Sequence, residues 1–107
     1  MSTFLKNVKL DLTSTGVTTL YTTPAAKTAV FKSILVSEDS GNADTITVTI
    51  TDASAAVFSL FKVKAVAANT TVELLSQPLV VETSEILKFT AATANRLHVV
   101  ASYMELG

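Results

Sequence analysis

The sequence predicts an all-β fold, an antiparallel β-sandwich of about eight strands with jelly-roll-like connectivity. Apolar and polar residues alternate in several segments, turn-forming residues recur about every ten residues, and no segment combines a helical period with a helix cap. Short strands separated by regular turns are typical of sandwiches and barrels. A chain of 107 residues is the size of one domain, so we expect residues 1–107 to form a single sandwich with a flexible N-terminal arm over residues 1–7.

Three segments are predicted to be strands with one buried face. Residues 45–51 alternate threonines with Ile46, Val48 and Ile50, as a half-buried antiparallel strand requires. Residues 8–12 and 71–74 show the same alternation over shorter lengths.

Two other segments, residues 28–37 and 97–104, carry apolar side chains on both faces. In a regular strand Phe31 and Leu35 share one face, whereas Ile34 lies on the other. Such a strand is either central in a sandwich or covered on its second face by another subunit. The residues we expect to make subunit contacts are Phe31, Leu35, Val100 and Met104.

Residues 53–68 are the ambiguous part of the chain. Ala, Leu and Lys favour a helix, and the segment is long enough for four turns. Its valines and phenylalanines favour strands, and a strand keeps the antiparallel order intact, so we predict a strand.

Two lysines, Lys32 and Lys88, interrupt apolar strands. We interpret them as edge-strand residues that block unwanted sheet pairing; the alternative is that each amine meets an acidic partner surface.

Composition excludes several functional classes. Eight basic and nine acidic residues give a net charge of −1, and no basic cluster exceeds Lys62 and Lys64, so direct nucleic-acid binding is disfavoured. The absence of cysteine excludes disulfides, thiolate metal sites and thiol catalysis. The N-terminus has no signal-peptide pattern and no apolar run reaches the roughly 20 residues that a bilayer needs, so we expect synthesis in the cytoplasm and no membrane association.

No residue pattern indicates an active site or a cofactor. The single histidine, His98, lies in a strand-like apolar run, where a structural or partner-facing role is favoured over general-base catalysis. The Gly-x-Ser-x-Gly nucleophile motif is missing. We therefore expect a protein that is not an enzyme, with no catalytic residues and no cofactor.

The acidic segment at residues 38–44 is the one candidate metal site. Glu38, Asp39, Asn42 and Asp44 supply oxygen ligands of the kind that calcium prefers. Their spacing does not match the twelve-residue calcium loop. A solvated hairpin loop, built from residues that favour turns, is the preferred interpretation.

Seven segments carry a resemblance to a known class of proteins. They read VTTLYTTPAAKTAV at residues 17–30, SILV at 33–36, TITVTIT at 45–51, AANTTVEL at 67–74, LVVE at 79–82, EILK at 85–88 and HVVASYME at 98–105. In this order the chain resembles the small β-sandwich virion proteins of tailed bacteriophages over nearly its whole length. The pattern departs at Ala26, where those relatives usually have glycine, and this departure argues against a left-handed turn there.

The resemblance implies a non-enzymatic component of the phage particle. The expected function is that of a capsid decoration or cement protein, a homotrimer on the head surface that binds the major capsid protein lattice and stabilises the head. Many weak contacts, repeated by symmetry, would then resist rupture. For capsid contact we expect the N-terminal residues Phe4, Leu5 and Lys6.

Two alternatives remain open from the sequence. One is a structural component of the tail or fibre. The other is a carbohydrate-binding adhesion module that uses calcium in the 38–44 loop, although a chain without Trp and with two Tyr supplies few aromatic rings for stacking on sugars.

Overall fold

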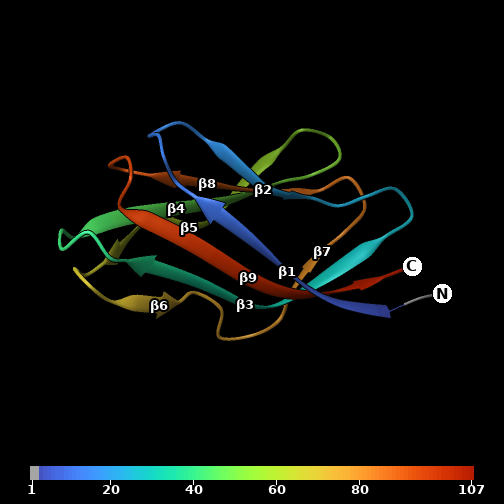
Figure 1. The fold of residues 1–107 in the computed structure, drawn as a ribbon. Coiled ribbons are helices and arrows are strands. Elements are labelled where there is room, and N and C mark those ends of the chain that lie inside the picture. The colour runs from blue at the N-terminus through green and yellow to red at the C-terminus, as the bar shows by residue number, and fades with distance from the viewer. Residues whose placement is uncertain (1–2) are drawn as a thin grey trace.

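The computed structural model describes residues 3–107, and within them it contains nine strands and no helix (Figure 1). The strands are β1 Thr3–Asp11, β2 Thr18–Thr22, β3 Thr28–Glu38, β4 Asp44–Thr51, β5 Val57–Val66, β6 Thr71–Glu73, β7 Leu79–Val81, β8 Ile86–Ala91 and β9 Leu97–Leu106. The predicted all-β class is confirmed, with nine strands in place of about eight.

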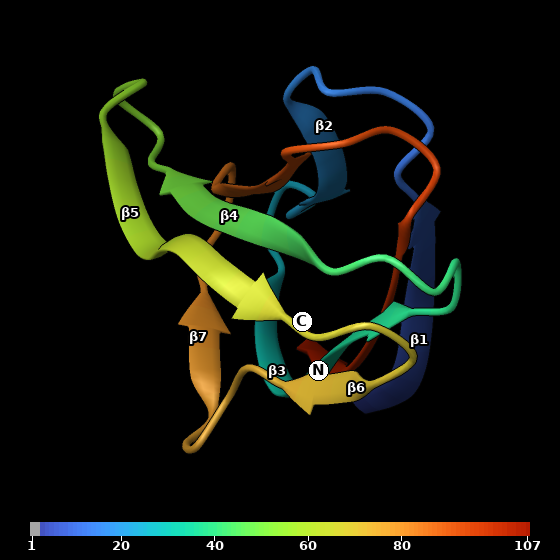
Figure 2. The ribbon, with the colours of Figure 1, turned by 90° about the vertical axis from the view of Figure 1, so that its left-hand side faces the viewer.

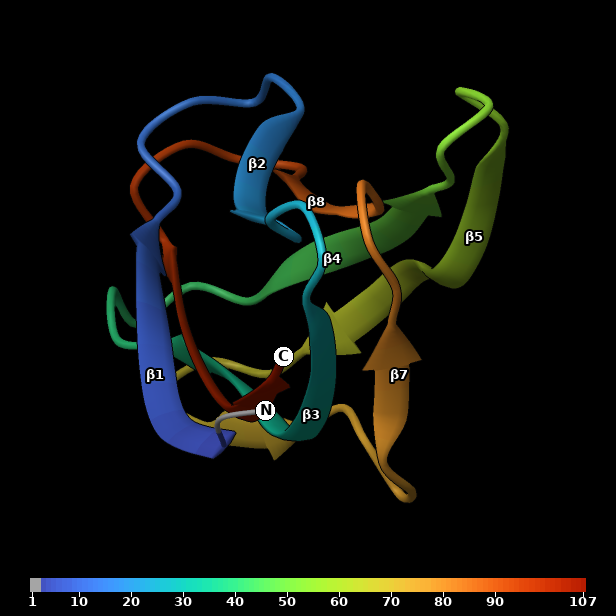
Figure 3. The same cartoon turned by 90° about the vertical axis from the view of Figure 1, so that its right-hand side faces the viewer.

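The strands form two antiparallel sheets that pack face to face (Figures 2 and 3). The five-stranded sheet has the order β1-β9-β3-β6, with β7 also paired to β3, and the four-stranded sheet has the order β2-β8-β4-β5. Without the short β7, these are the two four-stranded sheets of a jelly roll, in which β1 to β4 alternate between the sheets. The jelly-roll prediction is therefore confirmed.

The core lies between the sheets and follows the strand alternation. Ile46 and Val48 of β4 are fully buried opposite Ala91 and Phe89 of β8, whereas Thr45, Thr47 and Thr49 on the other face are half-buried; Thr51, at the end of the strand, is buried. This confirms the one-sided strand predicted for residues 45–51.

The ambiguous segment is mostly strand. Its residues Val57–Val66 form β5, which pairs antiparallel with β4, and residues 53–56 belong to the β4–β5 turn. In that turn Asp52 Oδ1 accepts hydrogen bonds from the backbone N–H groups of Ser54 and Ala56, both at 2.9 Å. The carboxylate thus favours the turn in place of a helix.

The expected N-terminal arm differs from the structure. Thr3 to Asn7 belong to β1 and pair residue by residue with β9, from Thr3 opposite Leu106 to Asn7 opposite Ser102. The prediction is wrong for residues 3–7, because their alternating side chains and backbone groups find partners on β9; residues 1–2 lie outside the described residues.

The proposed edge role is wrong for Lys88. Lys32 lies on β3, which has β9 on one side and β6 and β7 on the other, and Lys88 lies on β8 between β2 and β4. Lys88 therefore belongs to an interior strand. Lys32 lies between the parts of β3 that pair with β7 and with β6, so its edge role stays a prediction.

Ala26 adopts the left-handed conformation, with φ of 61°. The expectation that an alanine in place of glycine disfavours this conformation is therefore wrong. The turn closes through the Lys27 N–H, which donates to the Pro24 carbonyl at 3.2 Å. Alanine is tolerated there at an energetic cost of roughly 1 kcal/mol.

In the part of the chain that the structure describes, no helix is long and apolar enough to cross a membrane.

Candidate functional site

The outer face of the five-stranded sheet, the face turned away from the four-stranded sheet, carries an apolar row across four strands. Its members occupy registered positions on β1, β9, β3 and β7 and are Leu5, Met104, Val30 and Val80. Leu5 is 83% exposed and Val80 is 53% exposed, whereas Met104 and Val30 are half-buried. A soluble monomer seldom aligns exposed apolar side chains in this way, so this row is a candidate contact surface.

A second row runs parallel to the first, four residues further along the strands. Val100 and Leu35 form its apolar centre, and Lys9 and Glu73 flank them on β1 and β6. Val100 and Leu35 keep just over a third of their surface exposed. Three of the four predicted subunit-contact residues, Leu35, Val100 and Met104, therefore share the outer face.

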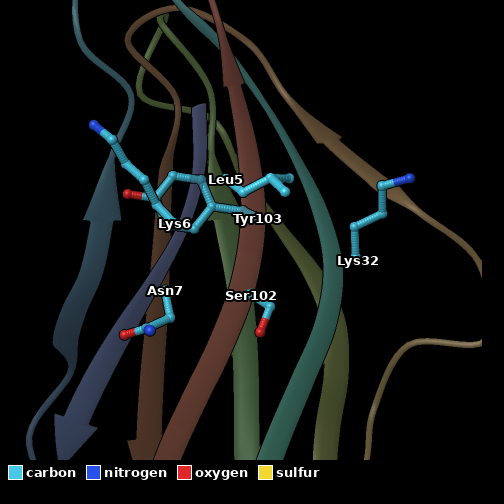
Figure 4. A pocket seen from close by; sticks show the side chains of 6 residues that line it. All are labelled: Leu5, Lys6, Asn7, Lys32, Ser102 and Tyr103. Carbon is cyan, nitrogen blue, oxygen red and sulfur yellow. The ribbon is translucent and has the colours of Figure 1, made fainter. Parts of the chain in front are cut away.

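Between the two rows, small side chains leave a shallow hollow of about 360 Å³. Asn7 and Ser102 are opposite one another on β1 and β9 and lie between Leu5 and Lys9 along the strand. The lining residues, drawn in Figure 4, are Leu5, Lys6, Asn7, Lys32, Ser102 and Tyr103.

Phe31 does not belong to this surface, which corrects the prediction that it makes subunit contacts. A β-bulge between Phe31 and Ser33 adds one residue to β3, so that Phe31 and Leu35 fall on opposite faces. The Phe31 side chain is fully buried. Its ring stacks on that of Tyr103 at a centroid distance of 4.8 Å and meets that of Tyr21 edge-on at 5.3 Å.

A carboxylate holds the bulge in place. Along β3, β7 pairs with Ala29–Phe31 and β6 pairs with Leu35–Ser37, so neither strand reaches the residues between. Glu73 fills this interval: its Oε2 accepts from the Ile34 N–H at 2.8 Å, and its Oε1 accepts from the Ser33 hydroxyl. Burial alone would raise the pKa of Glu73, but the hydrogen bonds from Ser33, Ile34 and Leu75 lower it.

The three residues predicted to contact a capsid differ in orientation. Phe4 is 50% exposed and Leu5 points outward, so both are available to a partner. Lys6 is held by its own chain, since its Nζ donates to Glu105 Oε1 at 2.9 Å.

Glu105 is buried and also accepts a hydrogen bond from the Tyr21 hydroxyl at 2.8 Å. The hydrogen bonds from Lys6 and then Tyr21 lower the pKa of Glu105, whereas burial, together with the bond to Glu105, raises the pKa of Tyr21. This network ties the β1 edge to the aromatic core. Lys6 is therefore removed from the set of free contact residues.

The acidic loop is organised by its own backbone. Glu38 is buried, and its carboxylate accepts from the N–H groups of Ser40, Gly41 and Asn69 at 2.9, 3.1 and 3.2 Å. Burial by itself would raise the pKa of Glu38, but these bonds and one from the Ser40 hydroxyl lower it to about 2.

Asp44, at the other end of this loop, is buried and accepts from the Thr93 N–H at 3.1 Å. Within residues 3–107 no group of three or more His, Cys, Asp or Glu side chains is arranged to hold a metal ion. The carboxylates of Glu38 and Asp44 instead fix the loops that join the two sheets.

His98 lies on the outer-face side of β9 between two aspartates. Its Nε2 is 3.3 Å from Asp11 Oδ1, and its Nδ1 is 3.7 Å from Asp39 Oδ1. These contacts join the end of β1 to the β3–β4 loop, which is a structural arrangement of the kind expected for this residue.

Sequence reasoning missed Val30 and Val80 as surface residues. It also missed Glu73 and the buried Glu105 as residues that hold hydrogen-bond networks together. The alternation of β3 already placed Val30 on the face opposite its buried neighbours, but the register that aligns it with Val80 comes from tertiary pairing.

Comparison of the sequence with protein-family models and with curated proteins finds no match.

Proposed function

We propose that this chain is a non-enzymatic structural protein of a phage particle, a capsid decoration or cement protein that binds the major capsid protein lattice on the head surface. The observation that carries the proposal is the outer face, where the apolar row of Leu5, Met104, Val30 and Val80 crosses four strands of a jelly roll. The resemblance of the sequence to small virion β-sandwich proteins supports it.

The outer face has the chemistry of a contact surface. Apolar rows lie on both sides of a hollow floored by Asn7 and Ser102, and Lys9 and Lys32 supply charge near them. A partner with an apolar ridge and acidic neighbours fits this face, because the ridge would be desolvated in the hollow while the amines set its orientation.

The size of the face favours repeated weak binding. Four strands spaced about 4.8 Å apart and about 30 Å long cover roughly 600 Å², less than the roughly 800 Å² per partner of a standard interface. One such contact is therefore weak. On a lattice with many copies, weak contacts add through multivalency.

Self-association is the second part of the proposal. We propose a homo-oligomer, with a trimer as the expected form. Because Leu35, Val100 and Met104 share the outer face with Leu5, we assign them to capsid contact together with Leu5, and the oligomer leaves the outer face free. A homo-oligomer would bring several outer faces to one site on the lattice.

The experiment is co-sedimentation of the purified protein with expanded phage capsids that lack a decoration protein. Val100→Asp places a charge in the centre of the second row, and Thr19→Asp places the same charge on an exposed position of the four-stranded sheet. We expect the wild type and Thr19→Asp to sediment with capsids and Val100→Asp to bind at least tenfold more weakly. Equal binding by all three, or none by the wild type, would refute the proposal.

The tail or fibre alternative would use the same outer face on a different partner. A wild-type protein that ignores capsids and sediments with purified tails would favour that alternative. We do not propose the carbohydrate-binding alternative, because Glu38 and Asp44 already accept hydrogen bonds from backbone N–H groups.

A further inference from the structure

The free edges of the two sheets differ in how well they could accept another strand. β6 and β7 have three residues each, and the five-residue β2 contains a bulge. β5 is longer, but its pairing with β4 shifts register twice. Within β5, Val63 has a left-handed φ of 53° and lies between Lys62 and Lys64. Short length, bulges and lysines are the devices that prevent edge-to-edge association.

β1 is the exception among the edges. It pairs with β9 over nine residues without a register shift, and in the described structure its other edge faces no strand. Figures 2 and 3 show β1 at one side of the molecule and β5 at the other. A long, regular edge presents a row of backbone donors and acceptors that another strand can pair with.

The side chains of β1 favour such pairing. Phe4 and Leu5 are exposed on opposite faces of the strand, so an added strand would cover apolar surface on both. The Lys6 ammonium is already neutralised by Glu105, and the Lys9 Nζ donates to Asn7 Oδ1 at 2.8 Å. Covering Lys6 therefore does not bury an unpaired charge.

We propose that two copies of this chain associate through their β1 edges, antiparallel about a two-fold axis at Asn7. Directly opposite residues in an antiparallel pair point to the same face of the sheet. Each outward-facing residue of β1 must therefore lie opposite an outward-facing residue of the second copy. The register centred on Asn7 is the one that uses all nine residues, with Thr3 opposite Asp11 of the second copy.

Charge and packing agree with this register. It places Phe4 opposite Leu10 of the second copy, and Leu5 opposite the aliphatic stem of Lys9. A centre at Lys6 would bring the two Lys6 side chains face to face, which is unfavourable. A centre at Val8 avoids that contact but pairs two residues fewer.

The association would join two five-stranded sheets into one and add roughly one backbone hydrogen bond per paired residue. It is independent of the proposed function, because it depends on the edge of β1 and not on what the outer face binds. We call this pairing of two β1 edges the β1 seam. If the protein also forms trimers, the β1 seam would join two trimers into a hexamer, so the expected assembly contains an even number of chains.

Cysteine cross-linking gives a direct test, because the natural chain contains no cysteine. Asn7→Cys would place the two thiols opposite one another, at a Cα separation of about 4.5–5.5 Å, which a disulfide spans. Lys9→Cys on the same strand would separate them by four residues, or about 13 Å, which it does not span. Thr19→Cys on the exposed surface of β2 controls for random collision.

Under mild oxidation we expect Asn7→Cys to form a covalent dimer in high yield, and Lys9→Cys and Thr19→Cys to remain uncross-linked. The double variant Leu5→Cys/Lys9→Cys is expected to cross-link as well. Light scattering of the wild type at about 100 µM should give the mass of two or six chains. Cross-linking of Asn7→Cys no greater than that of the controls, or a mass of one or three chains, would overturn the proposal.

Discussion

Removal of the Glu73 carboxylate should destabilise the fold at the β3 bulge. In Glu73→Ala the Ile34 N–H loses its 2.8 Å acceptor and the Leu75 N–H loses its 3.2 Å acceptor, and the Ser33 hydroxyl loses its partner. Ile34 itself is fully buried, so its amide has little access to water. The variant therefore leaves a backbone donor unsatisfied in the central strand.

The expected magnitude follows from these contacts. A hydrogen bond to a charged group contributes roughly 1.5–3 kcal/mol, but three bonds to one carboxylate are not additive and the Glu73 side chain is partly solvated. We expect a total loss of about 2 kcal/mol. For a domain of this size that corresponds to a decrease in Tm of about 8 °C, measured by thermal or urea unfolding followed by circular dichroism.

The pH dependence provides an independent check. The pKa of Glu73 is lowered in the folded protein from its ordinary value of 4.5, so its stabilising effect is fully present above that value and is lost as pH falls through the folded value. The difference in unfolding free energy between wild type and Glu73→Ala should therefore be larger at about pH 7 than at about pH 3.

Glu82→Ala is the matched control, because Glu82 is exposed and its carboxylate makes no hydrogen bond within residues 3–107. It should change the unfolding free energy by less than about 0.5 kcal/mol. A Glu73→Ala loss as small as that of the control, or one that does not depend on pH, would refute the bulge-holding role.

Three further variants test other parts of the structure. Phe31→Ala should cost about 3–5 kcal/mol in urea unfolding, because it empties the centre of the aromatic cluster; a stable variant with an altered oligomeric state would instead restore Phe31 as a contact residue. Glu38→Gln should lower Tm at neutral pH, and its difference from wild type should shrink as pH falls from 4.5 through about 2; an unchanged difference would contradict the loop network. Ala26→Gly should gain up to about 1 kcal/mol by relieving the left-handed alanine, whereas Ala25→Gly should not; a loss at position 26 would contradict the turn geometry.

The strand pattern was predictable because it depends on local alternation. Residues 45–49 alternate between half-buried threonines and fully buried Ile46 and Val48, and the alternation in burial ends only at Ile50 and Thr51. Residues 57–66 could be assigned as a strand from valine and phenylalanine content, even though alanine and lysine argue for a helix.

The failures have one physical origin, which is that contacts between distant parts of the chain override the local pattern. The bulge at Lys32 and Ser33 reverses the expected facing of Phe31, and no glycine marks it in the sequence. What holds the bulge is Glu73, about forty residues away in the chain. Lys6 looked like a free cation for the same reason, since its partner Glu105 is near the other terminus.

The candidate surface was predictable in part. Leu35, Val100 and Met104 share one face because β9 and the second half of β3 are regular, and a regular strand keeps its alternation. Their role as contact residues stays a prediction. Val80 was not predicted as a surface residue, because a strand of three residues is too short for its alternation to reveal which face is buried.

Pairing through the β1 seam would bring the outer faces of two copies side by side. A two-fold axis normal to the sheet at Asn7 would place the outer faces of both copies on the same side of one continuous sheet, since opposite residues share a face. The contact area would rise from roughly 600 Å² to roughly 1,200 Å², which exceeds the roughly 800 Å² per partner of a standard interface.

Leu5 would lie in both surfaces, so a variant at Leu5 cannot separate them. Asn7→Cys and Val100→Asp can, because one reports on the seam and the other on the outer face. If both proposals hold, the oxidised Asn7→Cys dimer should be retained on capsids at least tenfold longer than its reduced form at low protein concentration, because both faces stay engaged together. Equal retention of the two forms would mean that the seam does not serve capsid binding.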